Sequence, residues 1–242
     1  MQHNFKPPPR FNRKIGQALH DYGMLADRDR VMVAVSGGID SLTLAWVLKM
    51  WRAKAPVRFE VVAQIIDYGF WRQHEGMVGP EVSIGKQLEK FSIDYFIDEA
   101  WKIDDEDRTC FQCARNRRSQ LFDLARDRGF NKIAFGHHKD DLIETFFLNI
   151  LYSGNISTML PRQELFSGSF SIIRPFAYIE KKELIELAAS LKVTPVDNLC
   201  SLADKTNREK VRKLLAYLYR EEPERKNSIF AALANVRQEY ML

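Results

Sequence analysis

The feature that most constrains the fold of this chain is the run Ser36-Gly37-Gly38-Ile39-Asp40-Ser41. It follows the β-branched stretch 31–35, which predicts a buried strand, and leads into 41–50, which predicts an amphipathic helix. Glycines at a strand-to-helix turn let the backbone turn tightly and approach a ligand closely. The N–H groups and the dipole at the start of a helix favour an anion. The run therefore predicts a phosphate-binding site.

The run is not a Walker A loop, because that motif ends in Gly-Lys-Ser/Thr and Gly38 is followed by Ile39. It resembles the S-G-G-x-D-S signature of the PP-loop ATP pyrophosphatases. This resemblance implies that the loop holds the pyrophosphate end of ATP while AMP is transferred to a substrate oxygen. The cofactor-binding residues would then be Ser36, Gly37, Gly38, Ile39, Asp40 and Ser41. The alternative is an ordinary glycine-rich turn before a helix.

Composition sets wider limits on the class of protein. The chain has 242 residues, of which 45% are hydrophobic and 28% charged, enough to bury a sizeable core. No apolar run approaches the roughly 20 residues of a membrane span, and the first residues lack the apolar core of a signal peptide. We therefore expect a cytoplasmic protein without a membrane partner. The net charge of +4 supports a nucleic-acid partner only weakly.

Strand-like and helix-like segments alternate along the chain. This order predicts an α/β fold in which a parallel sheet carries helices on both faces. We expect strands at 31–35, 59–66, 94–97, 132–135 and 171–174. We expect helices at 11–22, 41–50, 81–91, 113–128, 140–151 and 181–191. The proline-rich segment 6–10 predicts an extended, non-helical lead-in.

The chain divides into three segments without a linker between them. These are an N-terminal extension and helix (1–28), the PP-loop domain (29–200) and a helical tail (201–242) that packs on the same domain. In the tail, 206–219 places Val211, Leu214, Leu215 and Leu218 on one helix face, and a last helix is expected at 227–238. The basic residues of 205–213 suit either RNA or a solvated helix face.

The three cysteines suggest a metal or redox site rather than disulfides. Cys110 and Cys113 form a C-x-x-C pair at the start of a predicted helix, and Cys200 lies far downstream. Zinc completed by His137 and His138, an iron–sulfur cluster and a redox pair all remain open. Cys200 alone could equally be a buried core residue.

Several segments together resemble the tRNA-cytidine 2-sulfurtransferases and other PP-loop enzymes that thiolate tRNA. The matching segments, in order, are 21–24, 29–33, 36–41, 110–118, 136–145, 174–178 and 198–200. The resemblance implies a [4Fe–4S] cluster held by Cys110, Cys113 and Cys200, with ATP and Mg²⁺ as cofactors. It also implies tRNA as substrate, a sulfur donor such as a cysteine desulfurase, and a homodimer.

Individual roles follow from where the predicted strands end. Ligands of an open parallel sheet bind outside the carboxyl ends of its strands, so we expect Ile66 and Asp67 near adenine or ribose, and Gly136 in the same crevice. Asp40 is the first candidate for Mg²⁺, the alternative being an acidic residue favoured by the helix dipole. Asp141 is the second acidic candidate, for Mg²⁺ or for proton handling.

Two further residues are candidates for a catalytic role. His138 falls in the same cluster as the acidic residues, unless it is only a structural histidine with its hydrogen bonds satisfied. Arg118 follows the C-x-x-C pair with Arg115 and Arg117, and these suit AMP, RNA phosphates or a solvated helix face.

The leading functional prediction is an ATP-dependent tRNA thiolase that adenylates a base carbonyl, with cytidine C2 favoured, and replaces its oxygen by sulfur. A PP-loop ligase or amidotransferase-type enzyme is one alternative, and it would not need the three cysteines. A non-catalytic nucleotide-binding iron–sulfur sensor is another. A desulfurase acting on thiolated bases would share the cluster but would not require ATP.

Overall fold

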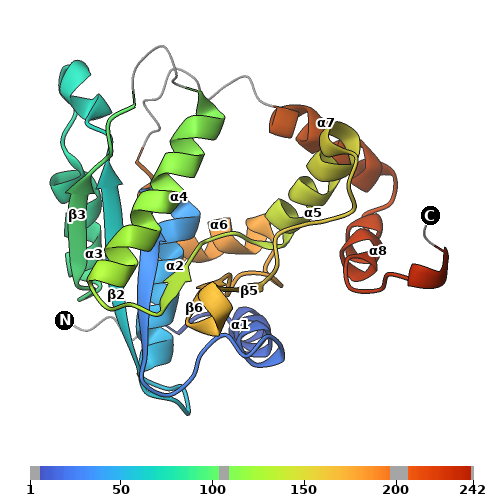
Figure 1. Cartoon of the computed structure of the whole chain (residues 1–242), viewed down its shortest axis with the longest axis horizontal. Helices are drawn as coiled ribbons and strands as arrows, with labels where there is room; N and C mark the ends of the chain where they lie inside the picture. Colours follow the sequence, from blue (N-terminus) through green and yellow to red (C-terminus); the bar gives the residue numbers. More distant parts are fainter. Residues whose placement is uncertain (1–5, 104–108, 197–206, 241–242) are drawn as a thin grey trace.

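The computed structural model describes residues 6–103, 109–196 and 207–240. In these residues the chain forms a six-stranded sheet in the order β3-β2-β1-β4-β6-β5 (Figure 1). The strands are β1 (Asp29–Val35), β2 (Phe59–Asp67), β3 (Tyr95–Glu99), β4 (Lys132–Ala134), β5 (Arg162–Leu165) and β6 (Phe170–Ile173). The helices are α1 (Pro9–Asp21), α2 (Ile39–Arg52), α3 (Lys86–Lys90), α4 (Cys110–Asp127), α5 (Lys139–Leu148), α6 (Lys181–Ser190), α7 (Asn207–Glu221) and α8 (Arg225–Ala232).

The strand order contains a switch point between β1 and β4. From β1 the chain builds outward through β2 and β3, and then returns to place β4 on the other side of β1. β1 pairs in parallel with both neighbours, and β6 pairs in parallel with β4. A mostly parallel sheet of this kind confirms the expected fold class. It also directs attention to the carboxyl ends of β1 and β4, where such sheets bind ligands.

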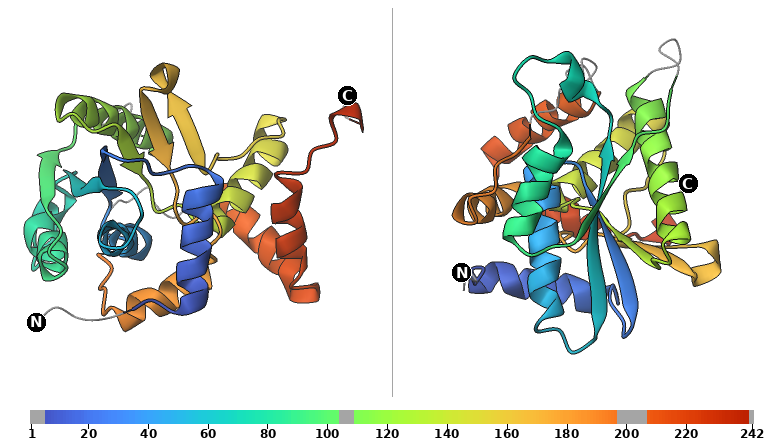
Figure 2. Two further views of the ribbon diagram at one scale, coloured as in Figure 1. Left: turned by 90° about the horizontal axis from the view of Figure 1, so that it is seen from below. Right: turned by 90° about the vertical axis from the view of Figure 1, so that its left-hand side faces the viewer.

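Helices cover both faces of the sheet (Figure 2). One face packs on α1, α2, α3 and α6 around the larger apolar core, which includes the fully buried Ile15, Leu44, Leu88 and Leu184. The opposite face packs on α4 through a smaller core. The two cores together hold the sheet rigid beneath the loops that follow its strands.

The C-terminal helices pack mainly on α5. Val211 and Leu215 of α7 are buried against Ile143 of α5, as the apolar spacing of the tail predicts. Leu214 of the same predicted face is 39% exposed, so the buried stripe is narrower than expected. The last helix, α8, ends at Ala232, earlier than the expected 238.

Three details differ from the sequence expectations. The proline-rich lead-in is partly helical, because Pro9 occupies the first helical position, where its missing N–H is not needed. The segment 81–91 is a π-helical turn (Glu81–Gly85) followed by the short α3. β5 was not expected, since the polar sequence Arg-Gln-Glu-Leu lacks a strand pattern and becomes a strand only by antiparallel pairing with β6.

No helix in the described ranges combines the length and the apolar composition that crossing a bilayer requires.

Candidate functional site

The glycine-rich run forms the turn between β1 and α2, as its sequence predicts. Gly37 has a φ of +87°, and a Cβ there would lie 3.0 Å from Ile84 Cδ1 and 3.1 Å from Val196 Cβ. Its carbonyl accepts a hydrogen bond from the Val196 N–H at 3.0 Å. Both the positive φ and the close neighbours therefore require glycine at this position.

The two serines of the turn fix its shape. Ser41 Oγ donates to the Gly38 carbonyl at 3.0 Å and accepts from the Ser36 N–H at 3.1 Å. The Leu42 N–H bonds to the Gly38 carbonyl, and the N–H groups before it have no acceptor within the helix. The turn, here called the cradle, therefore has the form expected of an anion-binding site.

The loop after β4 packs directly on this cradle. A Cβ at Gly136 would lie 2.9 Å from the Asp40 carbonyl carbon and 3.0 Å from its oxygen. The sequence predicts that Gly136 lies in the ligand crevice. The structure gives it a packing role as well, because only glycine allows the two loops to approach so closely.

Asp40 lies at the start of α2 and is paired with a lysine that the sequence argument missed. Lys181 Nζ donates to Asp40 Oδ1 and Oδ2 at 2.7 and 2.8 Å. One signal was available, since Lys181 and Lys182 both lie in the first turn of α6, where the helix dipole disfavours cations. A cation in that position calls for an acidic partner or an anionic ligand.

A buried histidine connects the acidic side chains of the site. His138 Nε2 lies 3.3 Å from Asp141 Oδ2 and 3.9 Å from Asp40 Oδ2, and His138 Nδ1 lies 3.5 Å from Asp140 Oδ2. Asp141 also caps α5 by accepting the His138 N–H at 3.0 Å. The structure therefore brings together Asp40, His138 and Asp141, which the sequence argument selected.

The surroundings of Asp140 favour its ionised form. Burial alone would raise its pKa, but the His138 ring, the Lys226 ammonium and the Lys181 N–H together hold the pKa of Asp140 well below its usual range. Lys226 Nζ contacts Asp140 Oδ1 at 2.5 Å, which also ties α8 to this corner of the site.

Helix α7 contributes two arginines to the same corner. Arg208 Nη1 lies 3.1 Å from Glu144 Oε2 and 3.5 Å from Asp141 Oδ1, and Arg212 Nε donates to Glu144 Oε1 at 2.9 Å. From the sequence these arginines belong to a basic segment, and their Arg-x-x-x-Arg spacing resembles a pattern of the wider group of thiolases. The spacing of Arg208 and Arg212, one turn apart on a helix, shows that they share a face, but not which carboxylate they meet.

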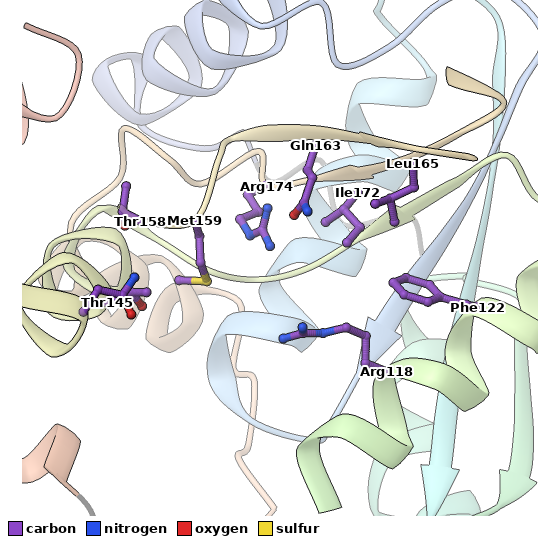
Figure 3. A pocket seen from close by; sticks show the side chains of 10 residues that line it. Arg118, Phe122, Thr145, Thr158, Met159, Gln163, Leu165, Ile172 and Arg174 are labelled. Atoms are coloured by element: carbon purple, nitrogen blue, oxygen red, sulfur yellow. The ribbon is translucent and has the colours of Figure 1, made fainter. Parts of the chain in front are cut away.

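A second group of basic residues lies beside His137. Arg174 Nε donates to His137 Nδ1 at 3.3 Å, and burial lowers the pKa of His137 to about 4. Arg174 and Arg118 both line a cavity of about 320 Å³ (Figure 3). Arg118, selected from the sequence, therefore shares its surroundings with Arg174.

The end of β2 is organised by Asp67. Its carboxylate accepts from the Gly69 N–H at 2.7 Å and from Trp71 Nε1 at 3.2 Å. Arg72 Nη2 lies 3.6 Å away. The Asp67 side chain thus holds the turn after β2, while the backbone of Ile66 and Asp67 lies at the same edge of the sheet as the cradle.

The cysteine pair begins α4. Thr109 caps the helix by accepting the Gln112 N–H, and Cys110 is the first helical residue. Cys113, one turn later, is a half-buried free thiol. Cys200 lies outside the described residues. Within the described ranges no group of three His, Cys, Asp or Glu side chains is arranged to hold a metal.

Known proteins are similar to this chain over nearly its whole length. A family model described as a PP-loop domain matches residues 7–218. The tRNA-cytidine(32) 2-sulfurtransferase of Ralstonia pickettii (strain 12J) is 34% identical over 94% of this chain and 73% of that protein. The protein of the same name from Alcanivorax borkumensis is 36% identical over 94% of this chain and 81% of that protein.

Two solved structures share the fold. The U34-tRNA thiolase NcsA from Methanococcus maripaludis, solved with its [4Fe-4S] cluster, superposes with a TM-score of 0.77 at 22% identity, over 96% of this chain and 79% of that chain. The NAD+ synthetase from Burkholderia pseudomallei superposes with a TM-score of 0.50 at 17% identity, over 88% of this chain and 82% of that chain.

Proposed function

This chain belongs to the PP-loop family, and from that premise we propose that it is an ATP-dependent enzyme that thiolates tRNA, replacing the C2 oxygen of a cytidine by sulfur. The observation that carries the proposal is the similarity to proteins named tRNA-cytidine(32) 2-sulfurtransferase. It extends over 94% of the chain, and therefore over nearly all of the elements that build the site.

The cradle of residues 36–41 would hold the pyrophosphate end of ATP. Asp40 fits a Mg²⁺ ion there, since Mg²⁺ is commonly held by one or two carboxylates together with substrate phosphates and water. Asp40 would exchange part of its contact with Lys181 for the ion, which leaves the Lys181 ammonium beside the phosphates. The backbone of Ile66 and Asp67 would face the adenosine.

The proposed reaction has two displacements. The cytidine O2 attacks the α-phosphorus of ATP and pyrophosphate leaves, and then sulfide adds at C2 and AMP leaves with the former carbonyl oxygen. The chain's contribution to the first step is positioning and charge neutralisation by the cradle and Lys181. His138 and Asp141 would hold a proton near Asp40.

The cysteines suit a [4Fe–4S] cluster. Cys110 and Cys113 lie in the first turn of α4, and thiolates in a C-x-x-C pair are typical cluster ligands. We assign Cys200 as the third ligand. When bound, the cluster would supply an iron site, not held by cysteine, that handles the transferred sulfide. A desulfurase-type sulfur donor and a homodimer complete the proposal.

The test combines cluster analysis with a direct assay of the product. After anaerobic reconstitution, the wild-type chain should carry about four iron and four sulfide per chain and absorb broadly near ~400 nm. With ATP, Mg²⁺, sulfide and a tRNA transcript it should form 2-thiocytidine, AMP and pyrophosphate. Cys200→Ala should lose both the cluster and the thiolation, whereas the neighbouring control Ser201→Ala should keep both.

Two results would contradict the proposal. One is zinc in place of iron, and the other is unchanged thiolation by Cys200→Ala. Formation of AMP with an amine acceptor and no sulfur incorporation would instead identify a PP-loop ligase.

A further inference from the structure

The cavity beside His137 is a pocket whose ten lining residues include two arginines and no carboxylate. Arg118 and Phe122 of α4 form one wall, and Arg174, directly after β6, lies on the opposite wall together with Gln163 of β5. Figure 3 shows both arginine side chains directed into the pocket. Thr145 and Asn149 add neutral hydrogen-bonding groups at the α5 end.

Arg174 is a buried cation without a carboxylate partner in the described chain, as is Lys139, which donates to Asn227 Oδ1. Arg174 is only 5% exposed, and its guanidinium donates to the Leu160 carbonyl and to His137 Nδ1. By contrast, the equally buried Lys132 has Asp29 at 3.3 Å, and Arg128 is bound by Asp98 at 2.8 and 2.9 Å. A buried charge without a counter-charge is costly unless a ligand supplies one.

Arg118 adds a second positive charge from the facing wall. Burial, followed by repulsion from Arg118, lowers the pKa of Arg174 to about 10. Two guanidinium groups that repel each other across a pocket without an acid favour an anion between them. Guanidinium forks match the paired oxygens of a phosphate, with two parallel N–H···O contacts each.

The pocket lies next to the proposed reaction site. Arg174 contacts His137, whose chain neighbour His138 lies among Asp40, Asp140 and Asp141. On the α5 side, Arg208 Nη2 lies 3.5 Å from Thr145 Oγ1, which lines the pocket. A phosphate in this pocket would therefore lie close to a nucleotide held at the reaction site.

We propose that the pocket formed by Arg118, Arg174 and the neutral polar groups around them is a phosphate-binding subsite that takes a backbone phosphate of the RNA substrate. This inference rests on the proposed function, because it assigns part of the same substrate to a defined place. Phe122, which packs against the smaller core and meets Phe170 edge to face, forms an apolar side of the pocket. In this assignment Arg174 binds the phosphate. Because that phosphate is held in place, the distance from the pocket at which the target nucleotide lies is restricted.

The experiment compares binding of RNA with binding of nucleotide. Arg118→Ala is the main variant because Arg118 is exposed and its loss should not affect folding. Arg126→Ala is the matched control, since it removes one positive charge from α4 outside the pocket. Arg174→Gln tests the buried partner. Fluorescence anisotropy of a labelled tRNA transcript at several salt concentrations gives the affinity and its salt dependence, and calorimetry gives the affinity for ATP.

Arg118→Ala should weaken tRNA binding by about tenfold and reduce the slope of log affinity against log salt by about one. Its affinity for ATP should equal that of the wild-type chain, and Arg126→Ala should bind tRNA like the wild type. Arg118→Lys should recover part of the affinity, because it restores the charge without the fork. Arg174→Gln should weaken tRNA binding at least as much as Arg118→Ala does.

Two outcomes would overturn the inference. If Arg118→Ala weakens ATP binding and leaves tRNA binding unchanged, the phosphate held in the pocket belongs to the nucleotide and not to RNA. If neither affinity changes, the pocket is not a phosphate site. Should Arg174→Gln fail to fold, Arg118→Ala and Arg118→Lys still decide the question.

The inference and the proposed function can fail separately. If the wild-type chain thiolates tRNA and Arg118→Ala does not change tRNA binding, the proposed subsite is wrong and the proposed function stands. If tRNA binding depends on the arginines but no thiolation occurs, the subsite is supported and the proposed reaction is wrong.

Discussion

Two neighbouring regions at the carboxyl edge of the sheet differ in how their charges are matched. Around His138 the carboxylates face cations, with Asp40 on Lys181, Asp140 on Lys226, and Glu144 shared by Arg208 and Arg212. In the pocket next to it, Arg118 and Arg174 face each other without a carboxylate. The first region has its charges balanced within the chain, whereas the second has an unbalanced positive charge. A ligand of the first region must therefore displace an existing ion pair, whereas an anion in the second would supply the missing charge.

The largest effect should come from protonating His137, which lies between the two regions. In the unfolded chain this histidine titrates near its ordinary pKa of about 6.5, and in the folded chain burial lowers the pKa to about 4. Between these values the unfolded chain binds more protons, so the free energy of unfolding should fall as pH drops from about 6.5 to about 4. The loss should reach up to about 3 kcal/mol.

Urea denaturation at a series of pH values measures this loss, and His137→Gln should flatten the dependence in that window. Added sulfate should also flatten it, because an anion beside Arg174 would favour the protonated ring. A His137→Gln profile identical to that of the wild-type chain would show that His137 is not the titrating group.

A smaller effect should follow from removing a carboxylate from the matched region. Glu144 is 7% exposed and is the shared partner of Arg208 and Arg212. Glu144→Gln would leave two arginines facing a neutral amide and should destabilise the chain by about 2 kcal/mol, since both arginines are partly solvated. Chemical denaturation measures the change. Glu209→Gln, an exposed position on α7, is the control, and an equal loss there would mean that the matched pairs do not secure α7.

The smallest effect on stability should come from Lys181→Gln. The Lys181 and Asp40 side chains are 41% and 29% exposed, so losing this ion pair should change the free energy of unfolding by less than about 1 kcal/mol. If Asp40 binds Mg²⁺, freeing its carboxylate should tighten the Mg²⁺ affinity in a titration without nucleotide, where the proposed contact of Lys181 with the phosphates plays no part. A weaker Mg²⁺ affinity would argue that Asp40 serves only to position Lys181.

The sequence was sufficient for the parts of the fold that depend on local pattern. The sequence predicts the strand, turn and helix of residues 31–50 and the alternation of helices and strands. These elements are determined by the spacing of apolar residues and by turn residues, which are local properties of the sequence. β5 was missed because its pairing with β6, and not its own composition, makes it a strand. The prediction of a non-helical segment at 6–10 is also wrong at Pro9, which is the first residue of α1.

The candidate site shows the same division. Asp40, His138 and Asp141 could be selected because they follow strands that end at the switch point. Lys181 could not be paired with Asp40 from the sequence, since the two residues lie 141 positions apart and many carboxylates could have met that ammonium. Arg174 was seen only as part of a motif, because the absence of an acidic neighbour is a property of the folded chain.

The contact between Gly136 and the Asp40 backbone has a mechanical consequence. It is van der Waals packing of backbone atoms, so neither salt nor protons can loosen it, and its space admits nothing larger than hydrogen at the glycine Cα. The contact therefore prevents the loop after β1 and the loop after β4 from moving closer together. A shift of the turn at 36–41 toward the loop after β4 would push on Gly136, the residue directly before His137 and His138.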